Sequence, residues 1–132
     1  MRIMEAERIV IIDDELDILQ LLKFSLRKFN CQVFCYQTLN EGLIGIPEVK
    51  PVLVFLDINL PDGNGLDAIA QIKKNNPGVK LIMISAYDSK IERTTAFSNG
   101  ADDFISKPFN SYLIISKLRG MGSDNNQLPV FD

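Results

Sequence analysis

Five side chains suited to phosphoryl or metal chemistry each stand at the end of a short apolar run. The acidic pair Asp13-Asp14 and the single Asp57 follow runs rich in Ile, Val and Leu, and Ser85 and Lys107 end later runs. In open parallel α/β sheets, ligands bind at the carboxyl ends of the strands. If these runs are parallel strands, three carboxylates, a hydroxyl group and an ammonium group converge on one edge of the sheet.

Three neighbouring carboxylates repel one another, so the sequence predicts a divalent cation among Asp13, Asp14 and Asp57. Oxygen ligands suit Mg²⁺, which keeps several waters and takes one or two carboxylates from the protein. A fold of this kind that binds phosphate or flavin directly needs a loop of glycines or hydroxyl residues whose backbone N–H groups face the anion. The loop here continues from Asp14 into Glu15 and repels a free phosphate. A phosphoryl group is therefore expected only together with the metal.

Each of these residues also has an ordinary structural interpretation. Asp57 by itself suits a carboxylate that caps a turn, and Asp13-Asp14 suits a charge pair at a helix start. Ser85 by itself is typical of a helix cap, and Lys107 of a solvated loop residue. Their joint placement at strand ends is what favours a common site.

Apolar runs alternate with helical patterns along the chain. After the first run, Leu19, Leu22 and Leu26 recur at helical spacing. Five strands alternating with five helices predict an α/β fold, a doubly wound parallel sheet with right-handed crossovers and helices on both faces. We expect strands at residues 8–12, 32–36, 52–56, 79–85 and 103–106, and helices after the first strand, at 40–46 (ended by Pro47), at 65–75, at 89–99 and after the cap Asn110.

Length and composition indicate one globular domain. The 132 residues are 46% hydrophobic and 23% charged, and the net charge of −3 with no basic stripe argues against nucleic-acid binding. Without histidine, the two cysteines, Cys31 and Cys35, cannot complete a Cys/His zinc site, and we expect both to be reduced packing residues. We expect a domain over residues 1–119 and a flexible polar tail over 120–132. No signal peptide and no apolar run of roughly 20 residues is visible, so we expect a cytoplasmic protein.

The chain resembles the response-regulator receiver domains of two-component signalling, which include the chemotaxis receivers. The resemblance covers residues 8–119 and implies a flavodoxin-like, five-stranded parallel sheet with strand order 2-1-3-4-5. Each matching segment alone is weak, but five in this order at strand ends are specific. The segments are Asp13-Asp14, Leu56-Asp57-Ile58-Asn59-Leu60-Pro61 continuing to Gly65, Ser85-Ala86, Gly100-Ala101-Asp102-Asp103-Phe104 and Lys107-Pro108-Phe109.

The resemblance implies a role for each site residue. Asp57 would take a phosphoryl group from a kinase phosphohistidine and form an aspartyl phosphate. Asp14, Asp57 and the backbone carbonyl of Asn59 would bind Mg²⁺, with Asp13 acting through water. Lys107 would pair with Asp57 first and with a phosphoryl oxygen afterwards. Positioning and charge neutralisation would then supply most of the catalysis.

The resemblance also implies a switch. Ser85 would move to hydrogen-bond the phosphoryl group, and Phe104 would swing inward into the space that Ser85 leaves. Many relatives carry Tyr at the position of Phe104, so partner contacts that need a hydroxyl are absent here. The Lys107–Pro108 peptide bond is expected to be cis, which would aim the lysine inward.

The output surface implied by the resemblance comprises the fourth helix, the fifth strand and the fifth helix. Phe97, Tyr112 and Ile115 are apolar candidates for exposure there. One receiver subfamily dimerises through this face with an Arg early in the last helix. Tyr112 stands near that place here, so that dimer is not expected.

The partners implied are a sensor histidine kinase or phosphotransfer protein, and a downstream target or output domain that the sequence does not identify. Direct nucleic-acid binding and membrane insertion are not expected. The resemblance implies a regulatory domain that undergoes Mg²⁺-dependent self-phosphorylation and autodephosphorylation, and not an enzyme in the usual sense.

Three alternatives stay open. A Mg²⁺-dependent phosphatase or phosphotransferase could turn over through an aspartyl phosphate, but such enzymes resemble the pattern Asp-x-Asp-x-Thr, and Asn59 replaces the second Asp. A flavin- or nucleotide-binding domain of the same architecture is disfavoured by the acidic loop at Asp13-Asp14-Glu15. The chain could also be the receiver part of a longer regulator, because the polar segment after Gly120 suits a linker as well as a free end.

Overall fold

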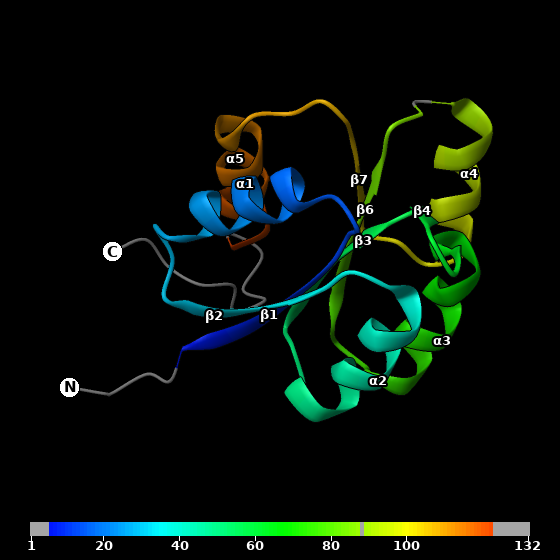
Figure 1. Cartoon of the computed structure of the whole chain (residues 1–132), viewed down its shortest axis with the longest axis horizontal. Coiled ribbons are helices and arrows are strands. Elements are labelled where there is room, and N and C mark those ends of the chain that lie inside the picture. The colour runs from blue at the N-terminus through cyan, green and yellow to red at the C-terminus, as the bar shows by residue number, and fades with distance from the viewer. Residues whose placement is uncertain (1–5, 88, 123–132) are drawn as a thin grey trace.

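The computed structural model describes residues 6–87 and 89–122, which form a three-layer α/β fold (Figure 1). Its elements, in chain order, are β1 (Glu7–Ile12), α1 (Leu16–Leu26), β2 (Cys31–Tyr36), α2 (Leu39–Val49), β3 (Leu53–Asp57), β4 (Asn59–Leu60), β5 (Gly63–Asn64), the 3-10 helix η1 (Gly65–Ala68), α3 (Ile69–Asn75), β6 (Lys80–Ser85), α4 (Lys90–Ser98), β7 (Asp103–Ser106) and α5 (Ser111–Gly122).

The central sheet has five parallel strands in the order β2-β1-β3-β6-β7. Counted along the chain without the short β4 and β5, this order is 2-1-3-4-5, so the predicted fold class is confirmed. Every residue of β3 is buried, because helices cover both faces of a parallel sheet. Helices α1 and α5 pack on the face that carries Phe55, and α2, α3 and α4 lie on the face that carries Leu56 (Figure 1).

The expectation that Pro47 ends the second helix is wrong. Helix α2 continues through Pro47 to Val49, and the backbone N–H of Lys50 closes it on Ile46 O at 2.8 Å. Pro47 lies in the last turn, where its missing N–H removes one helical hydrogen bond. Burial of Ile46 and Val49 against the sheet outweighs that loss.

The predicted start of the tail at Gly120 is also wrong. Helix α5 continues through Gly120 to Gly122, and Met121 packs against the apolar cluster between α1, α5 and the sheet. A glycine this close to a helix end costs only about 1 kcal/mol relative to alanine, which packing of the last turn offsets. The rest of the predicted tail, residues 123–132, lies outside the described residues. Within the described part of the chain, no helix is long and apolar enough to cross a membrane.

A short antiparallel hairpin, β4–β5, follows β3 and was not predicted. The turn of this hairpin carries Asp62, whose carboxylate accepts 2.8 Å hydrogen bonds from Asn40 N and Leu39 N. These two bonds satisfy free N–H groups at the start of α2, and they lower the pKa of Asp62. The segment that follows Asp57 is thereby joined to α2.

Candidate functional site

All five predicted side chains come from the carboxyl edge of the sheet. Carboxylate oxygens of Asp13, Asp14 and Asp57 lie within 4.8 Å of one another. Ser85 is the last residue of β6, which pairs with β3. Lys107 follows β7, and its backbone N–H donates to Ser85 O at 2.7 Å. The topology therefore places these residues on neighbouring strand ends, as the sequence predicts.

Asp13 is a fully buried carboxylate. Its Oδ1 accepts a 2.8 Å hydrogen bond from Glu15 N, which shapes the turn into α1, and its Oδ2 lies 3.0 Å from Lys107 Nζ. Burial raises the pKa of Asp13, against the lowering effects of the Glu15 backbone and of Lys107. Asp14 is exposed and lies on the solvent side of the cluster.

Lys107 makes three ion pairs with the carboxylates around it. Its Nζ lies 2.6 Å from Glu15 Oε1, 3.0 Å from Asp13 Oδ2 and 3.6 Å from Asp57 Oδ2. Burial acts to lower the pKa of Lys107, but the hydrogen bonds to Glu15 and Asp13 leave it raised. The peptide bond between Lys107 and Pro108 is cis, the isomer that the resemblance implied.

Glu15 as a lysine partner was missed in the sequence. The available signal was its place directly after the acidic pair, at the N-cap of α1.

Asp57 is 3% exposed and carries an unusually basic carboxylate. Burial, and next the charge of Asp13, raise the pKa of Asp57 to about 7, and Asp14 adds to this while Lys107 opposes it. The backbone around Asp57 is tightly enclosed, because a Cβ on Gly65 would collide with the Asp57 carbonyl oxygen. Among the described residues, the carboxylates of Asp13, Asp14 and Asp57 therefore carry more negative charge than the ammonium group of Lys107 compensates.

The cluster fits a hard divalent cation. All its ligand atoms are carboxylate oxygens, which Mg²⁺ prefers. Lys107 Nζ is the one cation paired with the buried Asp13 Oδ2 among the described residues, and burial together with the charges of Asp13 and Asp14 raises the pKa of Asp57, which a bound cation would oppose. Asp14 and Asn59 are exposed, which leaves an open side for water ligands.

The predicted switch residue Phe104 is buried, at 3% exposure. The guanidinium of Arg93 lies 4.7 Å from the centre of its ring. The ring is thus buried in the conformation described here, and the swing on phosphorylation stays a prediction. A phenyl ring without a hydroxyl group gains nothing by facing water, which favours this burial.

The predicted output surface presents two aromatic side chains. Phe97 on α4 is 46% exposed and Tyr112 on α5 is 78% exposed. Ile115 is instead partly buried against the cluster between α5, α1 and the sheet.

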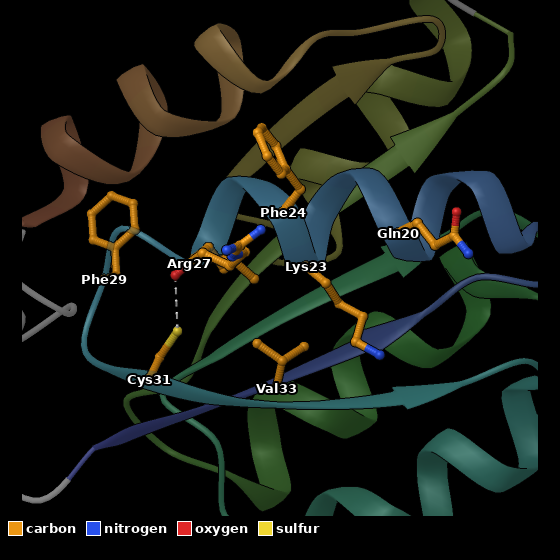
Figure 2. A pocket seen from close by; sticks show the side chains of 8 residues that line it. Gln20, Lys23, Phe24, Arg27, Phe29, Cys31 and Val33 are labelled. Carbon is orange, nitrogen blue, oxygen red and sulfur yellow. Dashed lines mark hydrogen bonds between the residues drawn. The ribbon is translucent and has the colours of Figure 1, made fainter.

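A separate hollow of about 670 Å³ lies between α1 and β2 (Figure 2). Lys23, Phe24 and Arg27 line its helix side, and Cys31 lines its strand side, where Sγ donates to Leu26 O at 3.5 Å. Both cysteines of the chain are free, and no predicted site residue lines this hollow. It is not continuous with the carboxylate cluster.

The comparisons with known proteins agree with this geometry. A family model described as the response regulator receiver domain matches residues 9–119. A response regulator receiver domain protein (CheY-like) from Methanospirillum hungatei JF-1 is 32% identical, over 90% of this chain and 95% of that chain, with a TM-score of 0.83.

Two DrrB structures are also similar. A BeF3-activated DrrB receiver domain is 25% identical, over 89% of this chain and 98% of that chain, with a TM-score of 0.82. The response regulator DrrB of Thermotoga maritima, an OmpR/PhoB homologue, is 25% identical over 91% of this chain, with a TM-score of 0.82. The match covers 54% of that regulator, so this chain spans about half its length. The family model spans most of the chain, from β1 to α5, and the chain therefore belongs to the response regulator receiver domains of two-component systems.

Proposed function

We propose that this receiver domain accepts a phosphoryl group on Asp57 with Mg²⁺ bound, and that the phosphorylated form alters the surface of α4, β7 and α5. The observation that carries the proposal is the convergence of three carboxylates and Lys107 at one sheet edge, with Asp57 almost fully buried among them. The donor would be a phosphohistidine on a sensor kinase or phosphotransfer protein in the cytoplasm. The receiver of the signal would be a downstream target or an output domain.

The chemical step is an in-line displacement at phosphorus. An Oδ atom of ionised Asp57 attacks the phosphorus atom, and a P–O bond forms while the P–N bond to the histidine breaks. The electron pair of the broken bond stays on the imidazole nitrogen, which takes a proton from solvent. Asp14, Asp57 and the backbone carbonyl of Asn59 would hold Mg²⁺, with Asp13 acting through water, and the ion would supply positive charge that neutralises the phosphoryl oxygens.

Lys107 is the second positive group of the proposed step. Its Nζ lies 3.6 Å from Asp57 Oδ2 and is already held by Asp13 and Glu15. A phosphoryl oxygen on Asp57 can pair with this ammonium group after a small movement. The two carboxylates orient Lys107 before the phosphoryl group arrives, so little ordering is left for the transfer step.

The proposed role is that of a regulatory domain that carries the phosphoryl group on its own Asp57. Asn59 provides no carboxylate two residues after Asp57, so a second acid–base group for turnover is absent from that position. Multiple turnover on small phosphate esters would favour the phosphatase alternative instead.

The test is an intact-mass measurement after incubation with acetyl phosphate, with Mg²⁺ or with EDTA. We expect one phosphoryl adduct on the unmodified chain that needs Mg²⁺ and is absent from Asp57→Asn. Asp67→Asn, which removes an exposed carboxylate outside the cluster, is the matched control and should behave as the parent protein. An adduct that persists in Asp57→Asn, or no adduct from acetyl phosphate or a phosphohistidine donor, would contradict the proposal.

A further inference from the structure

The hydroxyl group of Ser85 is fully occupied before any phosphoryl group is present. Ser85 is completely buried, and its Oγ lies 2.9 Å from Tyr87 O and 3.0 Å from Glu92 Oε1 while accepting from Tyr87 N at 3.0 Å. A serine hydroxyl carries one hydrogen, so it donates to one of the two oxygens at a time. The carboxylate of Glu92 is the stronger acceptor because it is charged.

Comparison with α2 shows that Glu92 is placed unusually for its position. Both helices begin with the pattern Ser/Thr-x-x-Glu, in which the cap hydroxyl accepts from the backbone N–H of the glutamate, from Glu41 to Thr38 and from Glu92 to Ser89. The carboxylate of Glu41 remains on its own cap, at 3.1 Å from Thr38 Oγ1. The carboxylate of Glu92 extends instead to Ser85, at the end of β6. Helix capping alone therefore does not explain where Glu92 lies.

The next residue of α4 contacts the other switch position. Arg93 lies over the ring of Phe104, with its guanidinium carbon 4.7 Å from the ring centre, and its Nη2 donates to Ser106 Oγ at 3.3 Å. Two consecutive residues in the first turn of α4 thus contact the end of β6 and the strand β7. A displacement of Ser85 is thereby linked to this turn.

We propose that Glu92 is a positioning residue that retains the Ser85 hydroxyl in the unphosphorylated form, and that a phosphoryl group on Asp57 competes with Glu92 for the same hydrogen. The inference rests on the proposed function, because it names what the phosphoryl group displaces. Capture of Ser85 by the phosphoryl group frees the carboxylate of Glu92 and loosens the first turn of α4. The bond between Ser85 and Glu92 consequently opposes phosphorylation and couples it to α4.

The test is a double-mutant cycle read by the affinity for beryllofluoride, a phosphoryl mimic, in the presence of Mg²⁺. The proteins are the parent chain, Glu92→Gln, Ser85→Ala, the double variant, and Glu41→Gln as the matched control at the equivalent helix position. We expect Glu92→Gln to bind beryllofluoride about three- to tenfold more tightly, because an amide oxygen accepts a weaker hydrogen bond than a carboxylate. In the Ser85→Ala background the same substitution should change the affinity by less than twofold. Glu41→Gln should match the parent chain.

The cycle separates this inference from simpler effects and from the proposed function. Removing a negative charge near the site could by itself tighten the binding of beryllofluoride. That effect would be equal with and without the Ser85 hydroxyl, so an equal change in both backgrounds would overturn the proposed competition between Glu92 and the phosphoryl group. Unchanged or weaker binding by Glu92→Gln would overturn it as well. A parent chain that binds no beryllofluoride would refute the proposed function and this inference together. If Glu92→Gln unfolds at a lower urea concentration than the parent chain, Glu92→Ala serves as the second variant. Its affinity for beryllofluoride is then compared with that of the parent chain at equal fractions of folded protein.

A second measurement reports on the contact directly. The amide of Tyr87 donates to Ser85 Oγ, so its ¹⁵N chemical shift should move in Glu92→Gln and not in Glu41→Gln. A merely structural role of Glu92 in α4 would leave this amide unchanged, and that result would overturn the inference.

Discussion

Replacing Asp57 with Asn should stabilise the metal-free protein, and the gain should grow with pH. The unfolded chain ionises this carboxyl near pH 3.8, whereas burial and the charges of Asp13 and Asp14 raise the pKa of Asp57 to about 7 in the folded state. Stability from this group is therefore fully present below pH 3.8 and is lost as the pH rises through 7. Asn resembles the protonated form at every pH, so the variant escapes this loss.

The size of the effect follows from the two pKa values. Each unit by which the pKa of Asp57 differs between the folded and unfolded states is worth about 1.4 kcal/mol. The full effect on the free energy of unfolding at pH 8 is therefore about 4 kcal/mol as an upper bound. At pH 5 the carboxyl group of Asp57 is mostly ionised in the unfolded chain and mostly protonated in the folded protein, and the same relation gives about 2 kcal/mol. The difference in the free energy of unfolding between Asp57→Asn and the parent chain should thus be about 2 kcal/mol larger at pH 8 than at pH 5.

The assay is urea unfolding at pH 5 and at pH 8 in EDTA, analysed by linear extrapolation. Asp67→Asn removes an exposed carboxylate and serves as the control, with an expected change within about 0.5 kcal/mol at both pH values. A stability difference between Asp57→Asn and the parent that does not change with pH would refute the reasoning. A variant that is less stable than the parent at pH 8 would refute it as well.

Three further predictions concern the same edge of the sheet. Mg²⁺ at about ten times its dissociation constant should stabilise the parent chain by about 1.4 kcal/mol in a thermal unfolding assay, and Asp57→Asn should lose most of that gain. Lys107→Met leaves three carboxylates without their ammonium partner and should cost about 3 kcal/mol in urea unfolding at pH 7, whereas equal stability would show that the pairs contribute nothing. Gly65→Ala places a Cβ against the Asp57 carbonyl oxygen and should cost about 2 kcal/mol and slow phosphorylation by acetyl phosphate. Gly120→Ala, where a Cβ meets open space, is its control and should not destabilise the protein.

The convergence of the site could be predicted because it depends only on strand direction. Asp13, Asp57 and Ser85 each stand where an apolar run ends, and parallel strands bring such ends to one edge. The contact between Ser85 and Glu92 could not be predicted in this way. Glu92 has the spacing of an ordinary capping glutamate, and only the packing of α4 against β6 decides which hydroxyl its carboxylate reaches.

Local rules failed where tertiary burial opposed them. Pro47 disfavours a continuing helix, but Ile46 and Val49 bury enough apolar surface to stabilise α2 beyond Pro47. The ring of Phe104 is buried in this structure, and its swing on phosphorylation stays a prediction. The pairing of Lys107 with Glu15 joins residues 92 positions apart, which sequence spacing does not reveal.

The hydrogen bonds from α2 to Asp62 have a consequence for metal affinity. Asn59 is the first residue of the β4–β5 hairpin and follows Asp57 by two positions, so the pairing of β3 with β6 holds this segment on one side and Asp62 holds it on the other. A loose loop would lose conformational entropy on closing around an ion, about 1–2 kcal/mol for each residue ordered. Here that loss accompanies folding, and the carbonyl of Asn59, the proposed ligand, is preorganised. The affinity for Mg²⁺ should thus depend on the first turn of α2, which offers the ion no ligand of its own.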